Sequence, residues 1–198
     1  MVNVLAENSA PHENTARGIA LVPERDKVFP NLTVAENLIA PIPRGISTAE
    51  RRRREMLVYQ FFPVLSELHN RIGGLLSAGE RQMLALGSAL VCAPQLLLVD
   101  ELSLGLAPVV VDDLLHRLVE IRREFGLTIL MVEQSAAIAL EIADYCYVME
   151  NGKIVLDGSA ERLRRHQDVQ EFYLGGKSGE RRSYRDIKQY RRRRRWYG

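Results

Sequence analysis

An uninterrupted apolar run that ends in two acidic residues constrains the fold of this chain most. Residues 96–99 are Leu-Leu-Leu-Val, and Asp100 and Glu101 follow at once. Such a run is typical of a strand that is buried on both faces of a parallel sheet. Ligands of open α/β sheets bind beyond the carboxyl ends of the strands. Asp100 is there well placed to hold Mg²⁺ through water, and Glu101 to orient an attacking water, although a pair of exposed loop acids gives the same pattern.

A capped helix start precedes this run by about one helix length. Ser77 and Glu80 fit the N-cap and N3 positions of a capping box. Free backbone N–H groups and the positive end of the helix dipole favour a phosphate at such a place. Gly79 would let a ligand approach the backbone, and Ser77 could donate a hydrogen bond. The segment alone is equally a well-capped helix without a ligand, and only its spacing to Asp100 and Glu101 favours phosphate binding.

The remaining patterns place these two segments in an α/β fold. Residues 18–22 predict a strand that Pro23 closes, and residues 127–132 predict a second fully apolar strand. Helices are predicted to begin at the capping boxes Thr33–Glu36 and Ser47–Glu50, with residues 51–54, four arginines, largely solvated. Asn151-Gly152 predicts a β-hairpin. The order of elements argues for a parallel sheet with a helical insertion and a C-terminal hairpin.

Charge divides the chain into a mildly acidic body and a basic tail. The net charge is +2, but residues 177–198 carry ten Lys or Arg and two acidic residues, and therefore +8 of it. The arginines with Trp196 and Tyr197 suit anionic lipid headgroups. They also suit nucleic acid, and a solvated tail is the third possibility. No apolar stretch approaches the ~18–20 residues that span a bilayer.

Taken together, these segments resemble the ATPases of ABC transporters. Residues 76–82 resemble the signature segment, residues 96–101 the Walker B strand and residues 103–108 the D-loop. The subgroup that the chain resembles most is the ATPase subunit of branched-chain amino-acid uptake systems. The details are Glu80 in place of the usual signature Gln, Ala107 in place of the D-loop Asp, Glu24 at the Q-loop position and Gln134 at the position of the switch His.

The resemblance implies roles for these residues. Glu101 would be the general base, and Asp100 would hold the Mg²⁺ shell. Gln134 would sense the γ-phosphate in the catalytic site. ATP would be held mainly by a second ABC ATPase subunit, as a homodimer or heterodimer, with Ser77, Ala78, Gly79, Glu80 and Glu24 as the cofactor-binding residues of this chain. Glu24 would also couple the site to membrane permease subunits.

The chain also departs from the family pattern. The family has a G-x-x-x-x-G-K-[ST] phosphate loop, and no such segment precedes Glu24. Gly176-Lys177-Ser178 has Glu171 where the first Gly should stand. We therefore expect a truncated, P-loop NTPase-like ABC cassette with an exposed apolar strand edge, low solubility and impaired ATP hydrolysis when alone. Its expected parts are a loose leader over 1–17, a partial ATPase domain over 18–176, with a helical subdomain at about 33–90, and a basic tail over 177–198.

The function that the resemblance implies is ATP binding and hydrolysis in an ABC importer for branched-chain or related amino acids. The chain would lie in the cytoplasm, peripheral on the inner face of the cell membrane. Urea and short amides are alternative substrates. A second possibility is an inactive cassette remnant that acts only as an interaction protein. A nucleic-acid-associated ATPase is supported only by the tail, so we expect no nucleic-acid partner.

Overall fold

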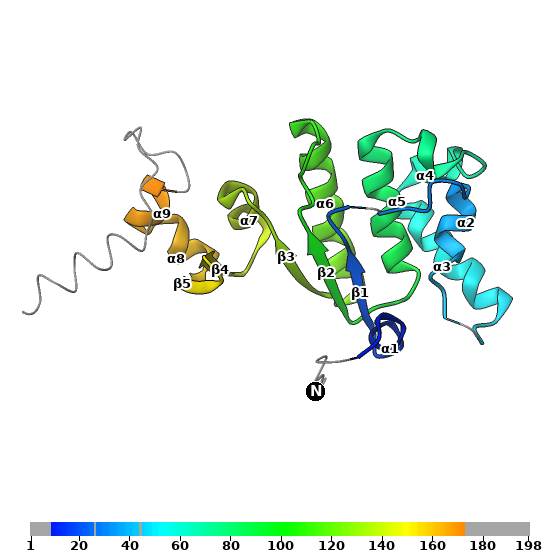
Figure 1. Ribbon diagram of the computed structural model, residues 1–198, viewed down its shortest axis with the longest axis horizontal. Coiled ribbons are helices and arrows are strands. Elements are labelled where there is room, and N and C mark those ends of the chain that lie inside the picture. The colour runs from blue at the N-terminus through cyan, green and yellow to red at the C-terminus, as the bar shows by residue number, and fades with distance from the viewer. Residues whose placement is uncertain (1–8, 26, 44, 173–198) are drawn as a thin grey trace, which may run out of the picture. The chain divides into compact units, whose positions relative to one another are not determined.

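Three parallel strands form the sheet of the first of two compact units (Figure 1). The computed structural model describes residues 9–25, 27–43 and 45–172. The first unit is Met1–Val132 and the second is Glu133–Gly198. The elements of the first unit are α1 (Pro11–Ala16), β1 (Ile19–Val22), α2 (Val34–Ile39), α3 (Thr48–Phe61), α4 (Pro63–Glu67), the 3-10 helix η1 (Gly73–Leu75), α5 (Ala78–Leu90), β2 (Leu96–Asp100), α6 (Pro108–Phe125) and β3 (Thr128–Val132).

The strand order is β1-β2-β3, with β2 in the middle. The register pairs Val22 with Val99, and Asp100 with Val132, so that the carboxyl ends of all three strands meet at one edge. We call this the carboxyl edge. Three apolar runs far apart in the sequence are thereby aligned, as the apolar pattern predicts for a parallel sheet.

Helices α2 to α5 pack together beside the sheet, around fully buried leucines of α2, α4 and α5. The closest approach is at Gly87 of α5, where an added Cβ would lie 2.7 Å from a methyl carbon of Val58 in α3 and 3.1 Å from one of Leu38 in α2. A helix-interior glycine costs about 1 kcal/mol relative to alanine. Here it allows three helices to come together.

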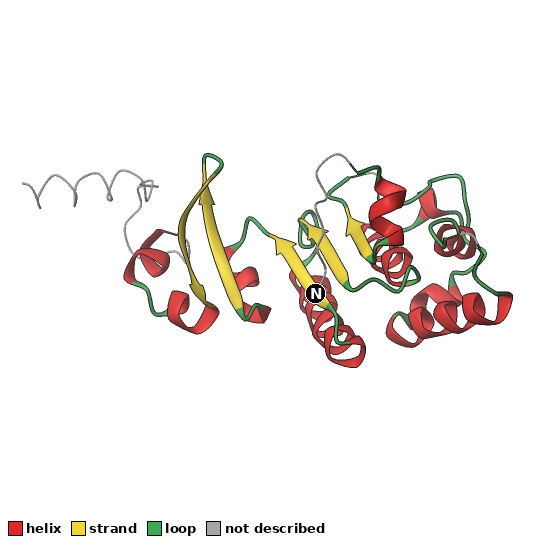
Figure 2. Cartoon of the chain, turned by 90° about the horizontal axis from the view of Figure 1, so that it is seen from below, coloured by secondary structure: helices red, strands yellow, loops and turns green. Residues whose placement is uncertain are grey.

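The two faces of the sheet are covered differently. Helix α6 lies along one face of the sheet (Figure 2), and we assign Leu97 and Val99 to that face because both are buried. On the other face, Leu21 and Leu130 stand on either side of Leu98 in register, and they remain 58% and 53% exposed. The prediction that the strand over 96–99 is buried on both faces is therefore wrong, because Leu96 and Leu98 are only partly buried. In the described part of the first unit, nothing covers this open face as helices cover the other.

The second unit contains α7 (Ala136–Ile142), β4 (Tyr145–Glu150), β5 (Lys153–Ser159), α8 (Ala160–Arg164) and α9 (Gln167–Phe172). Strands β4 and β5 form the predicted antiparallel hairpin. Asn151 and Gly152 both have positive φ, 50° and 74°, as a tight two-residue turn requires. A small core around Leu140, Leu163 and Val169 holds the hairpin and the helices together.

Three local expectations need correction. Helix α1 lies within the segment 1–17, which was expected to be loose. Ser47 caps α3, but the carboxylate of Glu50 binds Arg53 and Arg54 instead of completing a capping box. Arg54 is not solvated, since its side chain is only 17% exposed.

The basic tail 177–198 lies outside the described residues. Among the residues that are described, no helix is both long enough and apolar enough to cross a bilayer.

Candidate functional site

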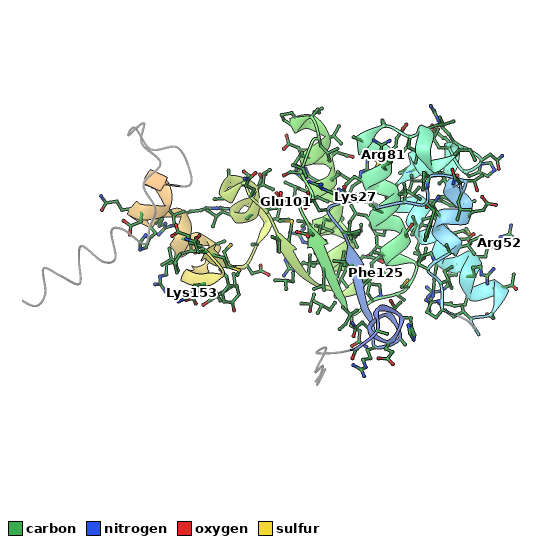
Figure 3. All side chains as sticks on the ribbon, viewed as in Figure 1. Lys27, Arg52, Arg81, Glu101, Phe125 and Lys153 are labelled. Carbon is green, nitrogen blue, oxygen red and sulfur yellow. The ribbon has the colours of Figure 1, made fainter. Side chains whose placement is uncertain are left out.

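Acidic residues follow two neighbouring strands at the carboxyl edge. Asp100 is the last residue of β2, and Glu101 comes directly after it. Glu24 follows β1 by two residues, and β1 pairs with β2 in parallel register. The structure therefore brings Glu24 to the same edge as Asp100 and Glu101, which the sequence alone could not establish. Figure 3 shows Glu101 toward this end of the strands.

The backbone at Glu101 is unusual. Its φ is +52°, in the left-handed region that non-glycine residues rarely adopt. Its N–H donates to the carbonyl of Val132 at the end of β3, at 2.9 Å, and the next residue, Leu102, is fully buried. Strained backbone that the surroundings hold in place is frequent at catalytic sites. The strand direction is broken at Glu101, so the orientation of its side chain no longer follows the alternation of β2.

Asp100 lies on the open face of the sheet. Side chains alternate along a strand, so Asp100 shares its face with Leu96 and Leu98, and with its register partner Val132. A segment that covers the open face at its carboxyl edge would therefore lie against the Asp100 side chain.

The start of α5 is built as the sequence predicts. Ser77 Oγ accepts from the Glu80 N–H at 3.3 Å, and the Glu80 carboxylate accepts from the Ser77 N–H at 2.6 Å. This backbone hydrogen bond is the main reason that the pKa of Glu80 lies below its ordinary value. The Ser77 hydroxyl thus caps the helix, and its side-chain hydrogen bond with Glu80 also lowers the pKa of that carboxyl group.

Gly79 has a packing role that the sequence did not reveal. A Cβ at this position would lie 3.0 Å from a methyl carbon of Val110, in the first turn of α6. The glycine therefore lets α5 and α6 approach each other, whether or not a ligand is bound. Beside it lies a largely apolar groove of about 320 Å³, which is lined by Phe62, Pro63, Val64, Ser77, Gly79, Glu80, Met83, Val110 and Arg117.

Two buried polar residues of the first unit hold segments of the chain in place, and the sequence analysis gave neither of them a role. Gln82 is 1% exposed, and its side-chain oxygen accepts from Lys27, so it ties α5 to the segment after Glu24. Asn37 is 2% exposed; its oxygen accepts from the Phe29 N–H at 2.7 Å, and its amide donates to three carbonyls of residues 29–33. Burial of a side-chain amide costs little free energy only when its polar atoms are hydrogen-bonded, as those of Asn37 are. Gln82 is the last residue of the signature-like segment 76–82, but its burial and its bond to Lys27 depend on residues far away in the sequence.

Gln134 lies in the second unit, two residues after the end of β3. It is exposed there. The geometry of the first unit therefore assembles Glu24, Asp100 and Glu101 at one edge, and Ser77 to Glu80 at the start of α5, without Gln134.

The donors at the carboxyl edge suit a hard cation. Mg²⁺ prefers oxygen ligands and is usually held by one or two carboxylates, together with water and substrate phosphates. Among the described residues, no group of three or more His, Cys, Asp or Glu side chains forms a complete metal cage. The acidic pair thus fits a cation that arrives with a phosphate ligand.

Fold and site define the class of protein: the chain belongs to the ABC transporter family, whose model matches residues 3–103. It falls among the ATP-binding proteins of that family, and membership implies that it binds nucleotide.

Two relatives show where in the family it lies. The high-affinity branched-chain amino acid transport ATP-binding protein BraG of Pseudomonas aeruginosa is 43% identical over 162 residues, which span 81% of this chain and 68% of BraG. The probable branched-chain amino acid transport ATP-binding protein LivF of Archaeoglobus fulgidus is 39% identical over 166 residues, or 83% and 70% of the two chains. The crystal structure of the ADP conformation of MJ1267, an ATP-binding cassette, matches with a TM-score of 0.70 and 28% identity, over 85% of this chain and 72% of MJ1267.

Proposed function

We propose that this chain is an ATP-hydrolysing subunit of an ABC importer for branched-chain or related amino acids. The substrate class comes from its similarity to BraG and LivF, at 43% and 39% identity. Subunits of this kind work with a second ATPase subunit and with membrane permeases. The observation that carries the proposal is the alignment of Glu24 with Asp100 and Glu101 at the carboxyl edge of paired parallel strands.

In this proposal, the chain contributes to two composite sites in a dimer of ATPase subunits. Ser77, Ala78, Gly79 and Glu80 present the amino end of α5 to the γ-phosphate of an ATP that the partner holds. At the carboxyl edge, Glu101 takes a proton from the attacking water. Mg²⁺, when bound, neutralises phosphate charge.

Asp100 would hold the water shell of that cation. Glu24 would couple the edge to the permease through the segment that Lys27 and Gln82 anchor. Gln134 would sense the γ-phosphate. We expect hydrolysis to depend on a second ATPase subunit, because the amino end of α5 acts on an ATP that the partner holds.

ATP hydrolysis in a mixture tests this proposal. The chain is mixed with a second ATPase subunit such as BraG, and we expect the rate to exceed that of the partner alone. A general base supplies about 10²–10⁴-fold, so Glu101→Gln should abolish the increment. Glu124→Gln, an exposed acid near the end of α6, is the matched control and should leave it unchanged.

The outcome also separates the proposal from its main alternative, a remnant that only binds a partner. If Glu101→Gln keeps the full increment while Ser77→Ala removes it, the chain lends only its α5 segment and the hydrolytic role is wrong. Replacing BraG by this chain in P. aeruginosa and comparing leucine with urea uptake would distinguish the amino-acid substrate from the amide alternative.

The location follows from the same proposal. A subunit that binds a permease would lie in the cytoplasm, on the inner face of the membrane, where residues 177–198 would meet anionic lipid. Deleting residues 177–198 should then weaken vesicle binding. A loss of nucleic-acid binding with a steep salt slope would instead support the nucleic-acid alternative.

A further inference from the structure

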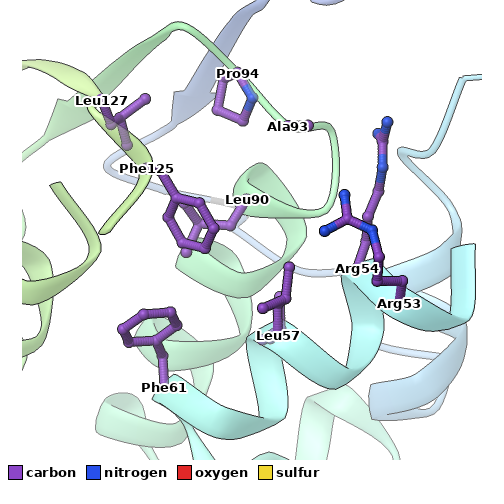
Figure 4. Close-up of a pocket in the computed structure, with 10 residues that line it drawn as sticks. Arg53, Arg54, Leu57, Phe61, Leu90, Ala93, Pro94, Phe125 and Leu127 are labelled. Atoms are coloured by element: carbon purple, nitrogen blue, oxygen red, sulfur yellow. The ribbon is translucent and has the colours of Figure 1, made fainter. Parts of the chain in front are cut away.

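A second cavity lies in the first unit, at the amino ends of the strands (Figure 4). Pro94 precedes β2 and Leu127 precedes β3, whereas Asp100 ends β2 at the carboxyl edge. The cavity has a volume of about 220 Å³. It is lined by Arg53, Arg54, Leu57, Val58 and Phe61 of α3, by Leu90, Ala93 and Pro94 at the end of α5 and after it, and by Phe125 and Leu127 at the end of α6 and before β3.

One side of the cavity is aromatic. The rings of Phe61 and Phe125 face each other with centroids 5.7 Å apart and an interplanar angle of 60°. Phe125 is still 44% exposed. Aromatic pairs in this tilted arrangement are favourable, and each ring can bury far more surface than it does here. A ligand with an apolar body would cover the exposed part of Phe125 and gain the corresponding hydrophobic free energy.

The other side is positively charged. Arg53 and Arg54 both bind the single carboxylate of Glu50, each through Nε at 2.8 Å. Arg54 also donates to the Val91 carbonyl at 3.0 Å, which fixes its position against α5. Of the residues that line the cavity, the two arginines are the only charged ones. Two guanidinium groups thus share one negative charge, and a positive charge is left over at this end.

We propose that this cavity binds a small anionic amphiphile, with a carboxylate or phosphate head at Arg53 and an apolar body against Phe61 and Phe125. The juxtaposition of net positive charge and an open aromatic pair favours this class over a neutral or a purely polar ligand. Arg53 is 63% exposed and can turn toward a ligand, whereas Arg54 is held by Val91. Pockets that bind drug-sized molecules have volumes of about 300–1,000 Å³, and this cavity is smaller, so its ligand is small.

The test is calorimetric titration of the full chain with octanoate, below its micelle concentration. We expect one saturable site with a dissociation constant on the order of 1 mM, as the ligand efficiency of small molecules allows. Arg53→Gln should weaken binding about fivefold, the scale of an exposed ion pair. Arg52→Gln is the matched control. It changes the neighbouring arginine of the same helix, which does not line the cavity and projects from the outer edge in Figure 3.

Further arms sharpen the result. n-Octanol should bind more weakly than octanoate, and Phe125→Ala should weaken both ligands. Phosphatidylglycerol vesicles test whether the anionic head group of the ligand belongs to a membrane lipid. Vesicle binding that Arg53→Gln weakens would identify a membrane lipid as the ligand. Binding of octanoate without binding to vesicles would identify a free solute. Circular dichroism of each variant confirms that it is folded.

Three outcomes would overturn the proposal. They are no saturable octanoate binding to the folded chain, equal losses in Arg52→Gln and Arg53→Gln, or octanol binding as tightly as octanoate. Self-association that Phe125→Ala abolishes, without any octanoate binding, would overturn it as well, because a second copy of the chain would then cover the cavity.

Discussion

The two faces of the three-stranded sheet have nearly the same composition but opposite surroundings. Leu97 is fully buried on the face beside α6, whereas Leu130, one strand away on the open face, is 53% exposed. Both are leucines in apolar runs, although Leu97 lies in the middle strand and Leu130 in an edge strand. The covered face therefore contributes to the stability of the first unit by itself. The open face still exposes apolar side chains, and their burial by a further segment or a partner would lower the free energy.

The comparison also bears on function, because Asp100 lies on the open face. A segment that covered the open face at the carboxyl edge would therefore also lie beside the proposed nucleotide site. The covered face and the helices beside it should tolerate changes poorly. The open face should tolerate them well until a partner binds.

The largest expected effect is at the covered face. Leu97→Ala should lower the free energy of unfolding by about 3 kcal/mol, because it leaves a cavity beneath α6. Leu130→Ala on the open face should cost less than about 1 kcal/mol. Urea denaturation of both variants at 25 °C measures the difference. Equal costs would mean that the open face is covered in solution.

The next effect concerns the helices beside the covered face. Gly87→Ala should destabilise by about 2 kcal/mol through overpacking against Val58, although alanine is the better helix former. In the double variant with Val58→Ala, much of this loss should be recovered, because the methyl carbon at 2.7 Å is removed. Strictly additive costs in urea denaturation would show that the two helices do not meet as described.

A smaller effect on stability is expected from Leu130→Lys. Its free energy of unfolding should stay within about 0.5 kcal/mol of the parent, since the position is exposed. Self-association should fall, because a lysine on an exposed strand opposes pairing with another chain. Sedimentation velocity over a range of concentrations measures this, with Leu130→Ile as the apolar control. Unchanged association would locate the contact elsewhere.

The smallest effect is electrostatic and lies outside both faces. Hydrogen bonds from Arg53 and then Arg54 lower the pKa of Glu50 to about 2 from its ordinary 4.5. The folded-state pKa is the depressed one, so this stabilisation is present above about pH 4.5 and is lost as the pH falls toward 2. The stability difference between the parent and Glu50→Gln should shrink over that range. Glu124→Gln serves as the control, and a difference that is constant with pH would contradict the assignment.

Particular residues show how far sequence reasoning reached. The capping boxes at Thr33 and Ser77 and the turn at Asn151-Gly152 are present as predicted. Each of these signals is complete within four adjacent residues, so no distant part of the chain is needed to interpret it. The same reasoning misjudged Glu50, because its carboxylate had two arginines within reach as well as the Ser47 N–H. Local patterns fail where several local partners compete.

The sequence by itself determined the three apolar strands, the hairpin turn, the caps at Thr33 and Ser77, the acidic pair at the end of β2 and the family resemblance, since these depend on short runs of neighbouring residues. Only the tertiary structure decided that Gly79 serves the contact with Val110, that Arg54 is held against α5, and that one face of the sheet is open. Burial depends on which element lies opposite a side chain, and that element is encoded tens of residues away.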